Sequence, residues 1–244
     1  MKINPRRIPT YLRNVTCGFV MLVAFGITWA QQPSQPQNSE ELQRILSRLD
    51  QTAAEFHTAQ ASFVWDQYER VVNGHDLQKG TVYFRRVANE VQMAADITDP
   101  QPPKYVLYTD SRVQVYYTKA NEVDTYNTGK DRATIESFLV LGFGGSGKDM
   151  LNSFDVKYMG RDKIDGNETV KLELVPKSDK VRNTFDHIWL WIDPSLGVSV
   201  QQQFFEPQSG DYRLAKYQNI KLNQRIPDPV FKLKTTPKTK VVPH

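Results

Sequence analysis

The sequence has very little cysteine and histidine. Its one cysteine is Cys17, and its four histidines are widely spaced, at His57, His75, His187 and His244. A lone thiol forms no internal disulfide and no thiolate metal site. No two histidines have the spacing of a metal-ligand pair. The sequence therefore predicts no metal centre and no cofactor.

A catalytic constellation is also missing. Ser62 lacks the glycine context of a nucleophile elbow, and no serine, histidine and acid form a recognisable triad. Acidic residues such as Asp96 and Asp193 stand at the ends of predicted strands, where carboxylates commonly solvate turns. These absences predict that the protein is not an enzyme.

An excess of positive charge is confined to the N-terminus. The chain has 31 Lys and Arg against 27 Asp and Glu, and four of the cations (Lys2, Arg6, Arg7 and Arg13) precede an apolar run at 15–29. Without these four the two signs balance at 27 each. A neutral chain has no general electrostatic attraction to nucleic acid or to an anionic membrane surface. The sequence predicts no nucleic acid partner.

The apolar run is too short for a membrane span, since it has about fifteen residues and a span needs roughly 20. Thr28 and Ala30 are small residues at the two positions that a signal peptidase recognises before its cleavage site. Most of the apolar run follows Cys17 rather than precedes it, which excludes a lipoprotein signal. We therefore predict a secretory signal peptide at 1–30, a flexible polar leader at 31–38 and a single domain at 39–244, outside the cytoplasm.

The rest of the chain has the periodicity of a mainly β protein. After Asn38, which forms a capping box with Glu41, apolar residues recur at helical spacing as far as Phe56. From Ala61 the period becomes 2, and turn pairs such as Asp165-Gly166 separate short strands. About eleven strands are predicted. Their connections are too short for crossover helices, so the sheet should be mainly antiparallel.

The stretch from Gly80 to Asn127 organises the predicted sheet. In its first strand Val82, Phe84 and Arg86 share one face, because side chains two apart point the same way. A cation in line with an apolar face needs carbonyls, carboxylates or water as partners. The alternative is that Arg86 extends from the strand end into solvent.

A helical interruption at 131–154 is a candidate lid over one sheet face. Its apolar residues before and within a glycine cluster are Phe138, Leu139, Leu141 and Phe143. The cluster, GFGGSGKD, nearly matches a phosphate-binding loop, but Asp149 replaces the hydroxyl residue that would meet magnesium. We therefore reject a nucleotide site and interpret the glycines as a hinge between two covering helices.

The numerous aromatic and β-branched residues have two interpretations. They could pack as a closed core, or the concave side of a strongly curved sheet with few helices could remain open to an apolar ligand. The second interpretation predicts a cavity lined by one face of the central strands: Val82, Phe84, Val91, Met93, Val113 and Val115.

Several short patterns spread over the chain resemble the LolA-like family of periplasmic outer-membrane lipoprotein carriers. A Phe-x-x-x-x-Ala-x-Phe-like segment corresponds to Phe56, Ala61 and Phe63, and a Gly-x-φ-x-φ-x-Arg pattern, with φ apolar, to residues 80–86. Residues 108–117 resemble the family's aspartate-containing turn between strands, and residues 231–237 resemble its late Phe-x-φ-x-x-Pro segment. Two departures are Val87, where the family has proline, and the glycine cluster.

The resemblance implies an incomplete antiparallel β-barrel closed by helices, whose apolar cavity accepts the acyl chains of lipoproteins. It implies that Arg86 is an inward arginine that bonds to the lid in the closed state. It also implies a periplasmic monomer whose partners are acylated lipoproteins or another lipid, an inner-membrane release complex and an outer-membrane acceptor. Two alternatives stay open: a sensor of the same fold that binds lipoprotein signals and controls an anti-sigma factor, and a structural module with a filled core.

Overall fold

The computed structural model describes residues 35–88, 90–129, 135, 138, 141 and 143–244. The chain divides into two units, Met1–Gln32 and Pro33–His244, and the description below concerns the second. The predicted signal peptide, residues 31–34 of the leader and Leu139 lie outside the described residues. Across the described range no helix is both long and apolar enough to cross a membrane.

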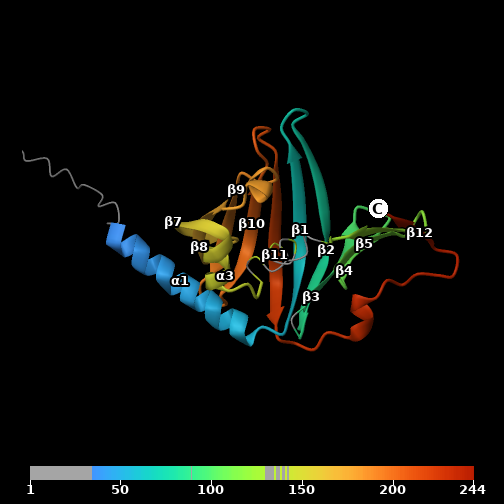
Figure 1. Cartoon of the computed structure of the whole chain (residues 1–244), viewed down its shortest axis with the longest axis horizontal. Helices are drawn as coiled ribbons and strands as arrows, with labels where there is room; N and C mark the ends of the chain where they lie inside the picture. Colours follow the sequence, from blue (N-terminus) through green and yellow to red (C-terminus); the bar gives the residue numbers. More distant parts are fainter. Residues whose placement is uncertain (1–34, 89, 130–134, 136–137, 139–140, 142) are drawn as a thin grey trace, which may run out of the picture. The chain divides into compact units, whose positions relative to one another are not determined.

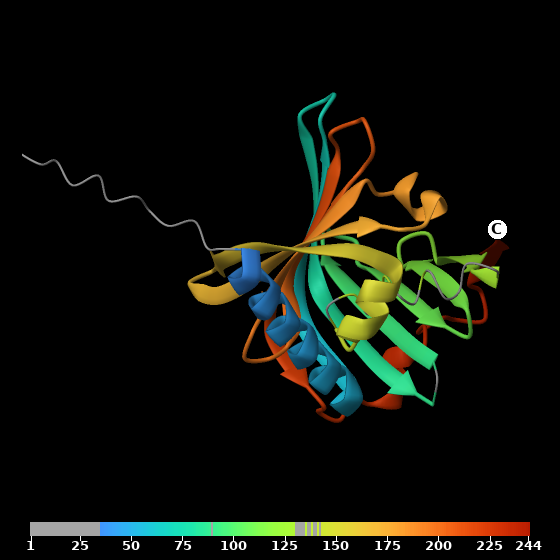
Figure 2. The same ribbon diagram turned by 60° about the vertical axis from the view of Figure 1, so that its left-hand side comes forward.

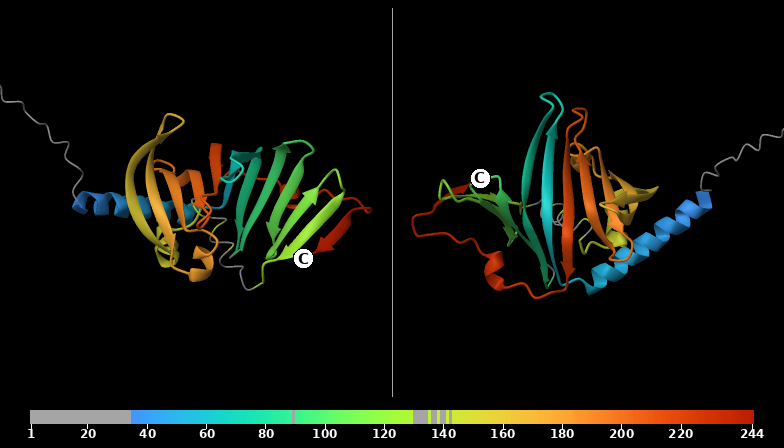
Figure 3. Two further views of the ribbon diagram at one scale, coloured as in Figure 1. Left: turned by 90° about the horizontal axis from the view of Figure 1, so that it is seen from above. Right: turned by 180° about the vertical axis from the view of Figure 1, so that it is seen from behind.

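In the part of the chain that the structure describes, twelve strands form one sheet in the order β12-β6-β5-β4-β3-β2-β1-β11-β10-β9-β8-β7. Neighbouring strands are antiparallel except β12 and β6, which are parallel. β7 and β12 form the two edges (Figure 3). The strands are β1 Thr58–Glu69, β2 Gly74–Val87, β3 Glu90–Asp99, β4 Lys104–Thr109, β5 Arg112–Tyr117, β6 Glu122–Asn127, β7 Phe154–Ile164, β8 Asn167–Pro176, β9 His187–Asp193, β10 Val198–Phe205, β11 Tyr212–Leu222 and β12 Lys240–Pro243.

Local turn chemistry explains the hairpins. Asp165 and Gly166 both have positive φ, 50° and 85°, as a two-residue turn between twisted strands requires. At Gly80 the β3 backbone comes so close that a Cβ would collide with the Asp96 carbonyl oxygen, which explains the glycine at this β-bulge. The predicted mainly β, mainly antiparallel open sheet is confirmed, with twelve described strands instead of about eleven.

The long helix α1, Gln35–Glu55, crosses the β7–β9 end of the sheet (Figures 1 and 2). It begins earlier than the Asn38 capping box predicts. Pro36 lies in its first turn, where the missing N–H needs no partner. Residues 35–38, predicted as part of the leader, are therefore helical. The shorter helices are α3 Gly147–Ser153, α4 Asp179–Arg182 and the 3₁₀ helix η2 Asp228–Phe231.

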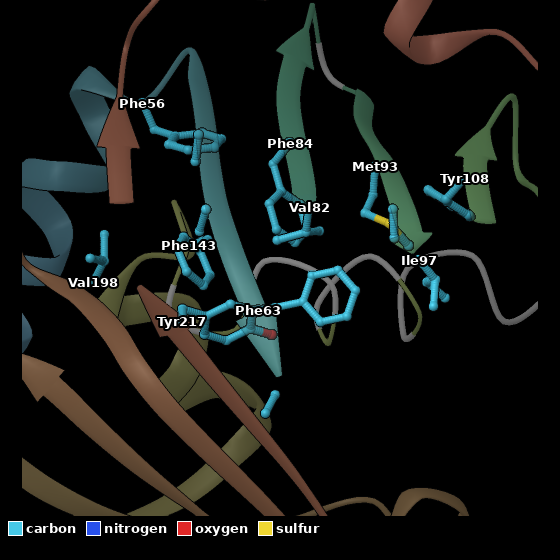
Figure 4. Close-up of a cluster of buried hydrophobic side chains, with 14 residues drawn as sticks. Phe56, Phe63, Val82, Phe84, Met93, Ile97, Tyr108, Phe143, Val198 and Tyr217 are labelled. Atoms are coloured by element: carbon cyan, nitrogen blue, oxygen red, sulfur yellow. The ribbon is translucent and has the colours of Figure 1, made fainter. Parts of the chain in front are cut away.

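Two apolar clusters occupy the concave face. One joins α1 and α3 to the inner side of β8 and β9, and includes Leu49, Leu172 and Leu190. The other lies over the central strands and includes Phe56, Val82, Phe84, Met93, Phe143 and Tyr217 (Figure 4). The first cluster is covered by helices. The second lies beside the open part of the concave face.

Candidate ligand cavity

A cavity of about 490 Å³ opens on the concave face beside the central cluster. Its lining comes from residues of β1, β2, β3, β10 and β11, together with Ile135, Phe138 and Phe185. Three of the predicted cavity residues, Val82, Phe84 and Met93, line it. Its size lies within the range of roughly 300–1,000 Å³ that is typical of ligand sites.

The other predicted cavity residues share the face but do not line the cavity. Val91 is paired with Arg86, and Val115 is paired with Val106 further along the sheet. Val113 packs at the border of the central cluster. Period 2 identifies the face of each strand. The distance of a residue from the cavity also depends on the curvature of its strand and on the residues that cover the sheet. The alternation pattern carries no information about either.

Two aromatic rings, those of Phe84 and Tyr217, line the base of the cavity, and Phe143 packs between them. Phe84 stacks on Phe143 with ring centroids 5.4 Å apart, and Phe143 meets the Tyr217 ring edge-on at 4.7 Å. Burial raises the pKa of the Tyr217 phenol, and a hydrogen bond with Trp65 opposes that shift. Tyr217 therefore stays neutral, so this wall carries no charge.

A second aromatic group holds the segment that covers the cavity. We define the covering segment by its described residues: Ile135, Phe138, Leu141 and 143–146. The Phe138 ring lies among Phe154, Phe185 and Phe204, at centroid distances of 6.2, 5.7 and 6.3 Å. Such edge-to-face contacts stabilise a cluster beyond its buried area.

The rim of the cavity is polar. Gln67, Asp76, Gln78 and Arg213 line it, and Arg213 forms an ion pair with Glu206 at 2.9 Å. The site is therefore apolar at its base and hydrogen-bonding at its rim. This arrangement suits an amphiphile, whose chain would occupy the base and whose polar end would lie at the rim.

Arg86 lies between the end of α1 and the covering segment. Its Nη1 donates to the Ala53 carbonyl oxygen at 2.9 Å, and its Nη2 donates to the Gly144 carbonyl oxygen at 2.8 Å. The guanidinium carbon is 5.5 Å from the centroid of the Phe56 ring. Arg86 therefore finds carbonyl partners and a π face, instead of extending into solvent.

The glycines of the covering segment allow close packing. Gly144 has φ +78°, and a Cβ there would be 2.5 Å from the Phe56 ring. A Cβ on Gly147 would be 2.6 Å from the Leu46 carbonyl oxygen of α1. Gly147 is also the first residue of α3, so it is a helix contact and not part of a hinge.

Asp149, which excludes the phosphate loop, has a structural role in α3. Its backbone N–H donates to Ser146 Oγ at 3.0 Å, and the Ser146 hydroxyl donates to Asp149 Oδ2 at 2.7 Å. Ser146 is therefore the N-cap of the helix, and the Asp149 carboxylate holds its hydroxyl in place.

Gln202 makes a contact that the sequence did not reveal. Its side-chain N–H donates to the Leu141 carbonyl oxygen, and the residue is buried in the cavity wall. A bulge between Ser199 and Gln201 shifts the register of β10 against β9. The run of three glutamines in β10 was the available signal, but alternation alone could not show which of them faces inward.

The predicted lid residues separate into different environments. Phe138 lines the cavity, Phe143 lies in the central cluster, and Leu141 packs with α1 and α3. Leu139 lies outside the described residues. Nowhere among the described side chains do three His, Cys, Asp or Glu residues gather in a way that could hold a metal ion.

No family model matches the chain, and no curated protein matches it. Solved structures do match. An uncharacterised conserved protein from Thermus thermophilus is 13% identical with a TM-score of 0.53, and the match covers 84% of this chain and 99% of that one. MucB is 14% identical with a TM-score of 0.52, and the match covers 83% of this chain and 66% of MucB.

The matches also include a LolA superfamily protein from Nitrosomonas europaea, which is 15% identical with a TM-score of 0.39, over 79% of this chain and 97% of that one. The two higher TM-scores show a shared fold. The superfamily that the sequence resembles is thus among the matched structures.

Proposed function

We propose that this protein binds the acyl chain of a lipoprotein or another lipid in the concave cavity and carries it between membranes of the envelope. The observation that supports the proposal is a cavity of about 490 Å³ with an aromatic base and a polar rim. Burying apolar ligand surface contributes roughly 25 cal/mol per Å². An acyl chain would obtain this gain at the base and leave its head group at the rim.

The covering segment fits the cycle of a carrier. Arg86 and Gln202 donate hydrogen bonds to its carbonyl oxygens, at Gly144 and Leu141. We propose that these contacts favour the closed, empty protein, so that a ligand binds only to the open fraction of molecules. The protein therefore holds its ligand less tightly, which suits a carrier that must release its cargo.

The place of action and the partners belong to the same proposal. A signal peptide at 1–30 would export the chain to the periplasm, where an inner-membrane complex would supply the cargo and an outer-membrane acceptor would take it. N-terminal sequencing of exported protein should find Gln31. An uncleaved N-terminus in membrane fractions would contradict this part of the proposal.

Two measurements test the binding function. Native mass spectrometry of protein purified from its own host should show a lipid adduct. A fluorescent fatty acid should bind the delipidated protein, and Met93→Glu should abolish this binding because it places a carboxylate in the cavity wall. Gln92→Glu is the matched control, since Gln92 lies on the opposite face and contacts Arg85. Failure of every apolar probe to bind wild type would contradict the proposal.

A regulatory module is the second candidate, and the structural similarity to MucB favours it. MucB has been solved in complex with MucA. If this chain acts in the same way, lipid occupancy would control its hold on a protein partner. Transfer of bound lipid to acceptor vesicles distinguishes the two, because a carrier releases its ligand to them and a sensor retains it.

A further inference from the structure

A second cavity, of about 170 Å³, lies on the outer face of the sheet under the C-terminal segment. We call it the outer-face cavity. Its base includes Tyr83 of β2, Asp96 of β3 and Tyr105 of β4, which face away from the Phe84 and Met93 side. Its other wall comes from the C-terminal segment, at Pro229, Val230, Lys232, Leu233 and Lys234. The concave cavity and this one therefore lie on opposite sides of the same strands.

The C-terminal wall is firmly attached. Phe231 is buried with Ala94 and Leu107. Arg85 places its guanidinium 4.2 Å from the centroid of the Phe231 ring and pairs with Asp228 at 2.5 Å. The outer-face cavity thus lies between two fixed elements.

Asp96 is the unusual group in this cavity. Its Oδ1 is buried, and no described residue donates a hydrogen bond to it. Burial raises the pKa of Asp96, and the Lys234 cation opposes the shift. The phenol pKa values of Tyr83 and Tyr105 are also raised, by burial and by the charge of Asp96. A buried carboxylate oxygen is destabilising unless it accepts a hydrogen bond, and a cationic donor suits it best.

The opposite charge lies at the exposed side of the cavity. Lys232 and Lys234 line it with exposed side chains, and Val230 and Leu233 supply apolar surface. The cavity therefore presents a carboxylate at its base, ammonium groups at its edge and an apolar wall between them. Its volume is well below the roughly 300 Å³ at which sites for drug-sized ligands begin.

We propose that the outer-face cavity binds a small zwitterion with an apolar side chain, of the class of free aliphatic amino acids. The ligand ammonium pairs with the Asp96 carboxylate at the base of the cavity. Its carboxylate faces Lys234 and Lys232, and its side chain contacts Val230 and Leu233. The two charged ends explain why both an acid and lysines line a cavity of this size.

Isothermal titration with L-leucine tests the site directly. We expect binding of one leucine per chain. N-acetyl-L-leucine lacks the ammonium and L-leucinamide lacks the carboxylate, so each should bind at least roughly tenfold more weakly. Phosphoethanolamine, a lipid head group with an ammonium and a phosphate but no apolar side chain, should also bind more weakly.

Variants locate the binding. Asp96→Asn keeps the shape of the side chain and should weaken leucine binding at least roughly tenfold, while Asp99→Asn, at the exposed end of β3, should leave it unchanged. Adding a fatty acid should also leave leucine binding unchanged, which separates this site from the concave cavity. The proposal is overturned if leucine does not bind, if N-acetyl-L-leucine or phosphoethanolamine binds as well as leucine, or if Asp96→Asn binds leucine normally.

Discussion

Arg86 Nη2 donates a 2.8 Å hydrogen bond to the carbonyl oxygen of Gly144, a residue 58 positions further along the chain. The bond joins β2 of the sheet to the covering segment. Gly144 can lie there because it has no side chain, since its Cα faces the Phe56 ring. Arg86 and Gly144 thus help to fix the covering segment at the edge of the cavity, together with Phe138 and Gln202.

Arg86→Leu should slow the release of bound lipid. Leucine preserves the apolar face and removes two charge-assisted hydrogen bonds, which under the proposed function together favour the closed, empty protein by roughly 1.5 to 3 kcal/mol. The loaded, open protein loses less, so the variant should retain its ligand at least roughly tenfold longer. Arg86→Lys should be intermediate, because an ammonium keeps the charge but not the planar fork.

The readout is transfer of a fluorescent acylated peptide to acceptor vesicles. Arg85→Leu is the control, because Arg85 lies on the outer face and pairs with Asp228. If Arg86→Leu releases the peptide as fast as wild type or faster, Arg86 is only a structural residue at the rim of the cavity.

Gly144→Ala should destabilise the protein by roughly 2 to 4 kcal/mol. The substitution adds left-handed backbone strain, about 1 to 2 kcal/mol, to overpacking against Phe56. Gly129→Ala separates the two effects, since Gly129 has φ +46° and a Cβ there would meet no atom within 4 Å. Gly129→Ala should therefore lower the free energy of unfolding by the backbone strain alone. Urea denaturation measures both, and equal losses would show that contact with Phe56 adds nothing.

Gln202→Ala should destabilise the native state by roughly 1 to 3 kcal/mol, because the Leu141 carbonyl oxygen loses its donor in a buried setting. Gln203→Ala, on the other face of the same strand, should have a much smaller effect. Chemical denaturation with circular dichroism gives the comparison. If the two variants are equally stable, Gln202 does not hold the covering segment.

Asp96→Asn should make the protein more stable at neutral pH. The usual pKa of the carboxyl is 3.8, and burial raises it in the folded state. Below that usual value both states are protonated and the group has no effect. As the pH rises from 3.8 through the raised pKa, the unfolded chain ionises first and the native state loses stability.

The stability gained by Asp96→Asn should therefore be largest at neutral pH and should vanish near pH 4. Denaturation at a series of pH values tests this, with Asp99→Asn as the control because that side chain is exposed and pairs with Lys79. A variant less stable than wild type at pH 7 would show that the Asp96 carboxylate has a stabilising partner.

The open antiparallel sheet was predictable because its determinants are local. Turn pairs such as Asp165-Gly166 and the alternation through Val82 and Phe84 define strands and faces without tertiary information. The early start of α1 at Gln35 was less visible, because the polar residues around Pro36 are typical of a leader. The stronger capping signal at Asn38 lies inside the helix.

The contacts around the cavity depended on tertiary structure. Gln202 faces inward because of a bulge, and Phe185 lines the wall from a loop after α4. Neither position has a periodic signature. The sequence indicated that Arg86 needs polar partners such as carbonyl oxygens. Ala53 provides one of these carbonyl oxygens because α1 ends beside β2.

Photo-crosslinking with a diazirine-bearing fatty acid tests the central proposal, an acyl chain in the concave cavity, most directly. The proposal predicts adducts on lining residues such as Phe84, Met93 and Phe138, which unlabelled fatty acid suppresses by competition. Adducts confined to the outer face of the sheet, or no saturable labelling, would contradict it.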